Sequence, residues 1–163
     1  MFTKALVTKV FTFFFLFAAR SWASPPIAPL GTEGLTIYPD KPDLFGRFYV
    51  GIKYLGSTAS YDNYLYLSCD SLGVPGLDGD DSNDILLFNN NTSNIGRTFQ
   101  LRFFTGSEII FRLNCKTTGQ NFYTGGAGRN PDGLEHARVQ KNYFGENLVS
   151  FEDLLGRPEW PNR

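Results

Sequence analysis

Histidine is almost absent from this chain of 163 residues, because His136 is the only one. A structural zinc site draws on several His and Cys ligands, and the chain has no second histidine to offer. Serine catalysis needs a base and an orienting acid beside the nucleophile, and no serine lies in a GxSxG sequence. The sequence therefore presents no catalytic constellation, and we expect a protein that is not an enzyme.

The sequence around His136 favours a structural role for it. His136 comes shortly after four residues typical of a turn, Asn130, Pro131, Asp132 and Gly133. In such a turn proline presets φ, aspartate suits the next position, and glycine tolerates positive φ. We expect a strand over 134–140 and a hydrogen-bonding histidine. The rival hypothesis is a hydrolase that uses His136 with Asp132 or Glu135. Glu135 is a poor partner, because adjacent strand residues face opposite sides.

Cysteine is also scarce, with only Cys69 and Cys115 present. An even pair in a secreted chain predicts one disulfide, which would close a loop of about 47 residues and stabilise the fold by roughly 4 kcal/mol. Each cysteine shares a strand face with large apolar residues, so both are expected to point inward and to connect two core strands. A metal or redox pair is the alternative, but the CxxC spacing typical of such pairs is missing.

Long apolar runs are limited to the N-terminus. Residues 1–23 combine Lys4 and Lys9 with an apolar stretch over about 10–19 and small residues before a cleavage point between Ala23 and Ser24. This pattern predicts a signal peptide, whose apolar stretch is too short to span a bilayer stably. We therefore expect a secreted protein, extracellular or periplasmic, with no membrane span after cleavage. The rival interpretation is a buried N-terminal strand.

The charge balance excludes some partners. The predicted signal peptide contains three of the fifteen basic residues and none of the sixteen acidic ones, so the remainder of the chain is mildly acidic. Nucleic acids and anionic membranes attract basic surfaces, so neither is an expected partner.

No window shows a sustained helical period, whereas short alternating segments recur along the chain. Residues 24–45 contain five prolines and are expected to form an extended lead-in with at most one short strand. Residues 46–163 are expected to form a single domain, an all-β antiparallel sandwich (jelly-roll-like) of about seven or eight strands. The strongest hairpin signal joins 97–104 to 108–115 through a short glycine turn. The candidate strands are 46–55, 61–69, 84–88, 97–104, 108–115, 120–124, 134–140 and 147–151.

The stretch 77–84 is the most acidic part of the chain. Asp78, Asp80, Ser82 and Asp84 lie at alternate positions, as ligands do in a calcium loop. The EF-hand template also requires glycine at its sixth position and glutamate at its twelfth, where this chain has Asn83 and Asn89. The three aspartates are therefore weak calcium candidates, and a solvated turn is the favoured interpretation.

Two further surface features are suggested by residue type. Asn90 and Asn91 begin overlapping glycosylation sequons, although a polar loop explains them equally well. Tyr61, Tyr64 and Tyr66 are candidates for stacking on sugar rings, which makes an extracellular glycan or protein a candidate partner.

The sequence FEDLLG ends the last candidate strand with two adjacent carboxylates, Glu152 and Asp153. Adjacent acids at the end of a strand, followed by a glycine loop, are candidate ligands for a hard cation such as Ca²⁺.

The C-terminal half resembles the bacterial "domain of unknown function 4114" family. The resemblance covers roughly 46–156 and depends mainly on TTGQNFYTGGAGRNPDGLEHARV, a short gap, and NLVSFEDLLG. It implies a small secreted β-sandwich, and it suggests calcium because the family follows FEDL with a glycine-rich run and several aspartates. This chain continues instead with RPEWPNR, so Glu152 and Asp153 alone represent that acidic cluster. The paired cysteines are not part of the family motif. A missing final strand would leave a sheet edge open to self-association.

Together these features predict a secreted, non-enzymatic β-sandwich module for extracellular binding or for surface or matrix assembly. A calcium-stabilised structural domain is the first alternative, and a hydrolase is the second.

Overall fold

The computed structural model describes residues 2–8, 31–143 and 146–156, and this part of the chain is almost entirely β. The strands are β1 (Phe2–Thr8), β2 (Thr32–Glu33), β3 (Phe48–Ser57), β4 (Asn63–Leu67), β5 (Ile85–Asn89), β6 (Thr98–Phe103), β7 (Phe111–Cys115), β8 (Gln120–Tyr123), β9 (Ala137–Tyr143) and β10 (Glu146–Glu152). The only helical segments described are two single 3₁₀ turns, η1 (Asp81–Asn83) and η2 (Ala127–Arg129). The expectation of an all-β antiparallel fold is confirmed.

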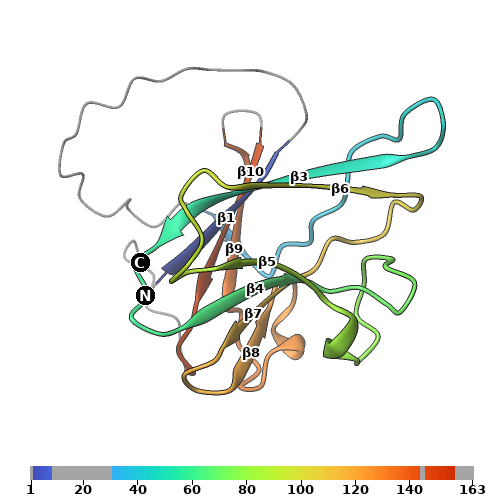
Figure 1. The fold of residues 1–163 in the computed structure, drawn as a ribbon. Helices are drawn as coiled ribbons and strands as arrows, with labels where there is room; N and C mark the ends of the chain where they lie inside the picture. The colour runs from blue at the N-terminus through green and yellow to red at the C-terminus, as the bar shows by residue number, and fades with distance from the viewer. Residues whose placement is uncertain (1, 9–30, 144–145, 157–163) are drawn as a thin grey trace, which may run out of the picture.

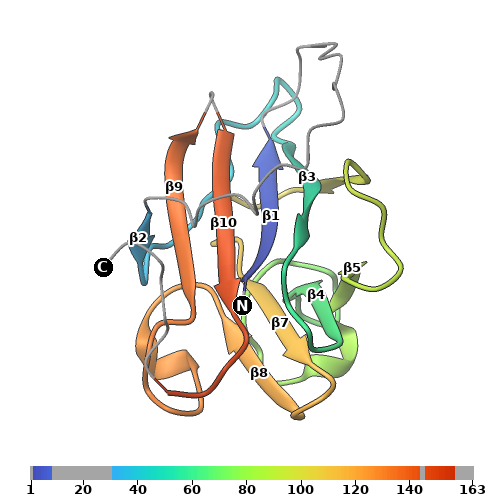
Figure 2. The same cartoon turned by 90° about the vertical axis from the view of Figure 1, so that its left-hand side faces the viewer.

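The strands form two antiparallel sheets that lie over one another (Figure 1). The larger sheet, sheet A, has the order β2-β9-β10-β1-β3-β6, and the smaller, sheet B, has the order β5-β4-β7-β8. Figure 2 looks onto sheet A, with β9, β10, β1 and β3 side by side. Because both sheets place apolar residues on their facing sides, one core fills the space between them.

Alternation of apolar and polar residues explains which side chains enter this core. Sheet A contributes β3 and β10 residues such as Ile52 and Phe151, and sheet B contributes Leu65 and Leu113. Their neighbours along each strand point the other way. The Tyr54 ring stacks on Phe88 at 5.3 Å between centroids, which connects β3 of one sheet with β5 of the other.

The predicted hairpin between 97–104 and 108–115 is wrong. Both segments are strands, but β6 pairs with β3 in sheet A, whereas β7 pairs with β4 and β8 in sheet B. The connection between them therefore passes from one layer to the other. A glycine-containing turn fits a crossover between sheets as well as it fits a hairpin, so the local signal could not distinguish them.

The predicted disulfide is also wrong, because Cys69 and Cys115 are both free and buried. Both belong to the core cluster, so their inward orientation was predicted correctly. The register decides against a bond: Cys115 lies opposite Asn63, at one end of the β4–β7 pair, and Cys69 follows β4 at the other end. Cys69 lies six positions after Asn63, which is about 20 Å of extended chain, whereas a disulfide needs Cα atoms roughly 4.4–6.8 Å apart.

The start of the chain forms a strand, as the rival interpretation of the N-terminus expected. Phe2–Thr8, at the start of the predicted signal peptide, is β1, and it pairs with β10 on one side and β3 on the other. The predicted apolar stretch at 10–19 and the cleavage point between Ala23 and Ser24 lie outside the described residues. In the described part of the lead-in, residues 31–45, β2 is the one short strand, and it pairs with β9 at the edge of sheet A.

None of the described residues forms a helix with the length and apolar character needed to cross a membrane.

Candidate functional site

The most elaborate polar structure of the molecule lies on the outer face of sheet B and is centred on Arg112. This residue belongs to β7, where Phe111 and Leu113 on either side point into the core, so the Arg112 side chain is directed outward. It is nevertheless only 4% exposed. Its guanidinium lies over the Tyr66 ring at 4.3 Å from the centroid, so β4 covers one of its faces.

Asp84 provides the main counter-charge for Arg112. The Arg112 Nε donates to Asp84 Oδ2 at 2.6 Å, and the side chains are 5% and 3% exposed. The other carboxylate oxygen of Asp84 accepts from the backbone N–H of Cys69 at 3.0 Å. The carboxylate is therefore held at both oxygens. These contacts fix the position of the carboxylate. Removing either partner of the buried pair would leave an uncompensated charge, which is strongly destabilising.

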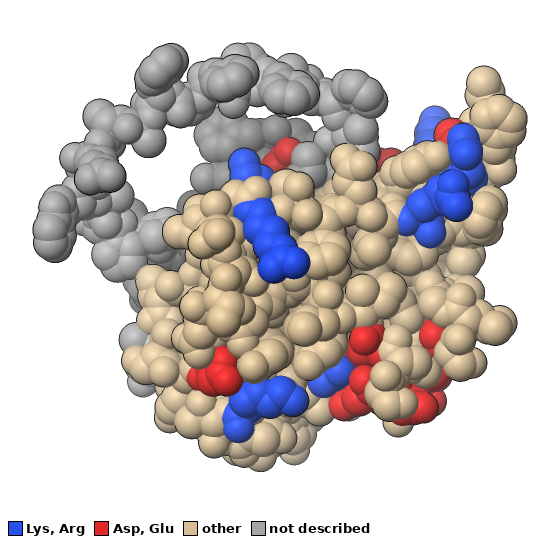
Figure 3. Space-filling view, in the orientation of Figure 1, with Lys and Arg blue, Asp and Glu red and all other residues tan. Residues whose placement is uncertain are grey.

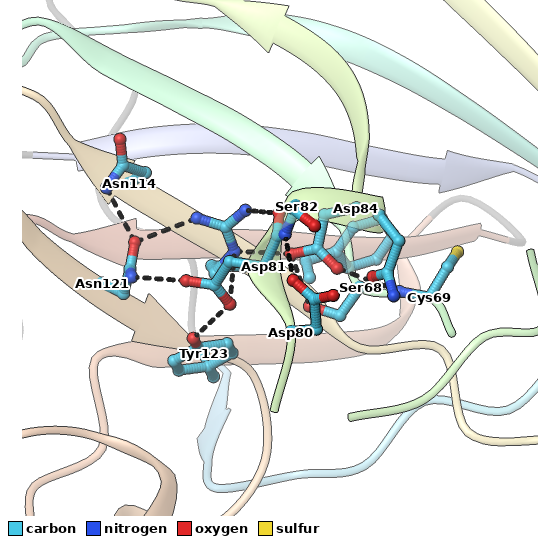
Figure 4. A network of polar contacts seen from close by, with 12 residues as sticks. Ser68, Cys69, Asp80, Asp81, Ser82, Asp84, Asn114, Asn121 and Tyr123 are labelled. Atoms are coloured by element: carbon cyan, nitrogen blue, oxygen red, sulfur yellow. Dashed lines mark hydrogen bonds and ion pairs between the residues drawn. The ribbon is translucent and has the colours of Figure 1, made fainter. Parts of the chain in front are cut away.

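A second row of polar side chains extends the network along β8 (Figure 4). The Tyr123 hydroxyl donates to Asp81 Oδ1 at 3.1 Å, and the Asn121 amide donates to Asp81 Oδ2 at 2.9 Å. Asn121 also accepts from Arg112 Nη1 at 3.0 Å and from the Asn114 amide at 2.7 Å. Burial, together with the nearby Asp81 carboxylate, raises the pKa of Tyr123 to about 12, so the phenol stays protonated.

A pocket of about 300 Å³ opens beside this network, and we call it the acidic pocket. It is lined by Ser68, Gly76, Leu77, Asp78, Gly79, Asp80, Asp81, Asp84, Tyr123 and Arg129. The space-filling view shows a group of acidic side chains at the lower right of the molecule (Figure 3). Arg112 pairs with Asp84 at 2.6 Å and lies 3.5 Å from Asp81, so Asp78 and Asp80 provide most of the excess negative charge.

The loop that carries these acids is held by its own hydrogen bonds. Asp78 Oδ1 accepts from the backbone N–H of Asp80, and Asp78 Oδ2 accepts from the Asn83 amide. Asp80 Oδ1 accepts from the N–H of Ser82 and so caps the η1 turn. Hydrogen bonds from Asp80 lower the pKa of Asp78, and hydrogen bonds from Ser82 lower the pKa of Asp80. At neutral pH both carboxyl groups are therefore ionised and can accept hydrogen bonds but not donate them.

Arg129 forms the far wall of the pocket, and the glycine run before it explains its position. Its guanidinium makes a two-point ion pair with Glu108, at 2.8 Å for both contacts, and donates to the Thr124 carbonyl at 2.9 Å. Gly125 has φ +91°, and an added Cβ would lie 2.2 Å from Arg129 Nη1. Only glycine fits there, because a side chain would be strained and would displace the guanidinium.

The three tyrosines proposed for sugar stacking do not act together. Tyr61 packs against the core, whereas Tyr64 and Tyr66 lie on the outer face of sheet B. Tyr66 is covered by Arg112, and the Lys116 ammonium lies 5.4 Å from the centre of the Tyr64 ring. Tyr123, which sequence reasoning did not select, is the tyrosine that lines the pocket.

The two sequon asparagines have different surroundings. Asn90 accepts from the N–H of Asn63 and donates to the Tyr61 carbonyl, so its amide contributes to local structure. Asn91 is exposed and donates to Asp62 at 2.8 Å.

The turn and the histidine form a separate corner, and Asp132 is at its centre. The N–H of Gly133 donates to the Asn130 carbonyl at 3.1 Å, which closes the turn, and Gly133 has φ +71°. One Asp132 oxygen accepts from the N–H of Leu134, and the other accepts from the N–H of Gly156 at 2.8 Å. Asp132 thus ties the NPDG turn to the end of FEDLLG, 24 residues further along the chain.

His136 completes this corner and is fully buried just before β9. Its Nε2 lies 2.9 Å from Asp132 Oδ2, and its ring stacks on Phe122 at 4.2 Å. Its Nδ1 is buried and has no hydrogen-bond partner in the part of the chain that the structure describes. Since the ring has no exposed surface and no part in the acidic pocket, the geometry matches that of a packing histidine.

Glu152 and Asp153 are both 1% exposed, which is unusual for two adjacent carboxyl groups. Asp153 Oδ2 accepts from the Asn63 amide at 2.6 Å, whereas Asp153 Oδ1 and Asn63 Oδ1 are buried without a partner. Burial raises the pKa of Glu152, and the nearby Asp153 acts in the same direction. Among the described residues, neither Asp153 Oδ1 nor Asn63 Oδ1 has a hydrogen-bond donor.

The weak calcium candidates do not converge. Asp84 is used by Arg112, and Asp78 and Asp80 are used by their own loop. Within residues 2–8, 31–143 and 146–156, no three His, Cys, Asp or Glu side chains are grouped as metal ligands. Any cation near Asp153 would therefore depend on amide, backbone and water oxygens as well.

Sequence reasoning missed Arg112, Asn121, Tyr123 and Arg129. A signal for the first three was present: in FRLNC and QNFY the polar residues alternate with residues that point into the core. Two such strands in register place Arg112 opposite Tyr123 and Asn114 opposite Asn121. The pairing of β7 with β8 was the missing information.

Comparison with known proteins gave no match: no family model, no curated protein and no solved structure resembles this chain closely enough to place it.

Proposed function

We propose that this chain is a secreted, non-enzymatic β-sandwich module that binds an extracellular glycan in the acidic pocket. The observation that supports this most is the combination of carboxylates and an aromatic ring in one open pocket of about 300 Å³. Ionised Asp78 and Asp80 are fixed by their loop hydrogen bonds, and each carboxylate keeps further lone pairs that can accept from vicinal sugar hydroxyls. Tyr123 provides an apolar wall.

The same residues argue against catalysis in the pocket. Glycoside hydrolysis requires one carboxyl group whose raised pKa keeps it protonated as the general acid. Asp78 and Asp80 have lowered pKa values instead. The remaining pair, His136 and Asp132, is buried in another part of the molecule. The resemblance to a secreted β-sandwich family is consistent with a binding role.

The test is a glycan array and a matrix-polymer screen with the full chain, followed by titration of any ligand found. The variant Asp78→Asn with Asp80→Asn keeps acceptors for the loop N–H groups but removes the charge. We expect it to weaken binding by at least about tenfold, because charge-assisted hydrogen bonds contribute roughly 1.5–3 kcal/mol each. Asp40→Asn, at an exposed position outside the pocket, is the matched control. An empty screen, or binding that both variants retain, would contradict the proposal.

A second candidate function, a calcium-stabilised domain, is favoured by the unpartnered oxygens of Asp153 and Asn63. A buried carboxylate without a counter-charge is costly, and a hard cation bound by both oxygens would remove that cost. Glu152 is the adjacent second acid. A cation that binds only the folded state raises the Tm with its concentration.

The measurement is thermal unfolding in millimolar calcium and in chelator, for the native chain and for Asp153→Asn. We expect calcium to raise the Tm of the native chain and to leave Asp153→Asn unchanged. An identical Tm of the native chain in both conditions would exclude this candidate.

A further inference from the structure

A tight turn just before β3 exposes two large apolar side chains. Leu44 is fully exposed and Phe45 is 75% exposed, although glycine, proline and small polar residues are the usual occupants of turns. The turn projects from one end of sheet A, at the upper right of Figure 1. The register brings Phe104 to the same end, because β3 begins at Phe48 opposite Phe103, and Phe104 is 72% exposed. We call Leu44, Phe45 and Phe104 the apolar tip.

The Asp43 side chain holds this turn in one conformation. One carboxylate oxygen accepts from the N–H groups of Phe45 and Arg47, at 2.8 Å and 3.0 Å, and the other accepts from the Arg47 guanidinium at 2.7 Å. The hydrogen bond from the Arg47 side chain is the main cause that lowers the pKa of Asp43 to about 2. The N–H of Gly46 donates to the Asp43 carbonyl at 3.0 Å, and Gly46 has φ +73°. The exposed apolar side chains are therefore carried on a preorganised frame, which reduces the entropy cost of binding.

Arginine side chains lie directly behind the apolar tip. The Arg47 guanidinium lies 4.7 Å from the centre of the Phe45 ring, and the Arg102 guanidinium lies 5.8 Å from the centre of the Phe104 ring. Arg47 is paired with Asp43, whereas Arg102 forms no ion pair with any described residue. Figure 3 shows mainly basic side chains at the upper right of the molecule and acidic ones at the lower right. The acidic net charge of the chain is thus not evenly spread over its surface.

The order of these groups matches the layers of a phospholipid surface. The outermost side chains are apolar and suit the boundary of the acyl chains, and the guanidinium groups behind them suit the phosphates of the headgroups. A projecting tip enters a fluid bilayer without a preformed cavity. A protein partner would instead need a complementary cleft to bury the same side chains.

We propose that the apolar tip is a docking site for a phospholipid bilayer surface, into which Leu44, Phe45 and Phe104 insert while Arg102 contacts the lipid phosphates. The net charge argued against an anionic membrane as a partner, but net charge averages over a surface on which the basic and acidic groups are separated. Such docking is peripheral and needs no spanning segment. No residue of the apolar tip lines the acidic pocket, so the proposal does not depend on glycan binding.

The experiment is co-sedimentation of the full chain with vesicles of phosphatidylcholine, alone or mixed with phosphatidylglycerol. We expect binding to both kinds of vesicle, and tighter binding to the anionic mixture. The variant Leu44→Ser with Phe45→Ser should weaken binding to both by at least about tenfold, because two large apolar side chains no longer insert. Arg102→Gln should weaken binding to the anionic vesicles by about fivefold and should have little effect on phosphatidylcholine.

Leu72→Ser is the matched control, because Leu72 is 86% exposed in the turn that follows β4, outside the apolar tip. It should bind vesicles as the native chain does. Asp78→Asn with Asp80→Asn should also bind vesicles normally, which separates this proposal from the proposed glycan site. The substituted side chains of the apolar tip are exposed, so the Tm of these variants should equal that of the native chain.

Insertion itself is measured with Phe45→Trp in vesicles that contain brominated lipid. We expect stronger quenching of its fluorescence than of the native chain, which contains Trp22 and Trp160. The proposal is overturned if the native chain sediments with neither kind of vesicle, or if Phe45→Trp shows no additional quenching. It is also overturned if the serine variant of the apolar tip binds as the native chain does, or if Leu72→Ser loses as much binding. Lipid-free self-association that the serine variant abolishes would overturn it as well, because the tip would then be a protein contact.

Discussion

Two buried carboxylates, Asp84 and Asp153, have opposite surroundings. Asp84 is held by the Arg112 guanidinium and by the N–H of Cys69. Asp153 receives one hydrogen bond, from the Asn63 amide, and its second oxygen has no partner. Among the described residues no basic side chain forms an ion pair with it. Burial alone therefore does not define a site. At Asp84 both carboxylate oxygens have a partner, whereas at Asp153 only one oxygen has a partner among the described residues.

The largest effect is expected from Arg112→Met. This change leaves the Asp84 carboxylate buried without its counter-charge, and it should lower the free energy of unfolding by about 3–5 kcal/mol. Urea unfolding followed by fluorescence measures it. The double variant Arg112→Met with Asp84→Leu removes both charges and should recover much of the loss. A single variant that loses less than about 1 kcal/mol would show that Asp84 is not dependent on Arg112.

The change from aspartate to asparagine should alter the free energy of unfolding in opposite directions at Asp84 and Asp153. Asp84→Asn weakens the pair with Arg112 and should destabilise the fold. Asp153→Asn replaces a buried carboxyl group that has no ion-pair partner among the described residues and should stabilise the fold, by about 1–3 kcal/mol, when measured in chelator. Unfolding of both variants in the same buffer gives the comparison directly. Equal losses at the two positions would mean that Asp153 is as well satisfied as Asp84.

Asp132 is only partly buried and accepts several hydrogen bonds, and its contribution to stability should depend on pH. Burial opposes its ionisation, but hydrogen bonds from Gly156, His136 and Leu134 prevail and lower its pKa. An acid whose folded pKa lies below its unfolded value of 3.8 stabilises the fold above that pH and loses this contribution as the pH falls below it. We expect the Tm of the native chain to fall below about pH 4 more steeply than that of Asp132→Asn. Parallel curves between pH 7 and pH 2.5 would contradict this.

The smallest effect is expected from Tyr123→Phe, which removes one hydrogen bond to Asp81 at the rim of the network. The loss should be about 0.5–1.5 kcal/mol, because Asp81 also accepts from Asn121. Absorbance titration provides a second measurement, since the phenol that ionises at about pH 12 should disappear in the variant. A loss as large as that of Arg112→Met would place Tyr123 at the centre of the network.

The strand segments could be predicted because alternation is a local property. The predicted strands over 46–55, 97–104 and 147–151 correspond to β3, β6 and β10. Pairing is not local, which is why the hairpin and the disulfide were wrong. Both cysteines point into the core as the alternation predicts, yet the antiparallel register places them at opposite ends of β4 and β7.

In the candidate site, too, features that are local in the sequence were predicted and features that depend on strand pairing were not. Asp78, Asp80 and Asp84 were noticed because they are close together in the sequence. Arg112 and Tyr123 were not, because only the pairing of β7 with β8 brings them beside that loop. The turn at Asn130–Gly133 was visible from its residues, whereas the contact between Asp132 and Gly156 required the fold.

The sequence by itself determined the all-β class, the strand segments from β3 onward and the turn chemistry, because backbone preference and side-chain alternation act over a few neighbouring residues. The tertiary structure alone decided which strands pair, which acid meets Arg112, and that Phe2–Thr8 lies between β3 and β10. These depend on register and sheet order, and hydrogen bonds between distant segments decide both.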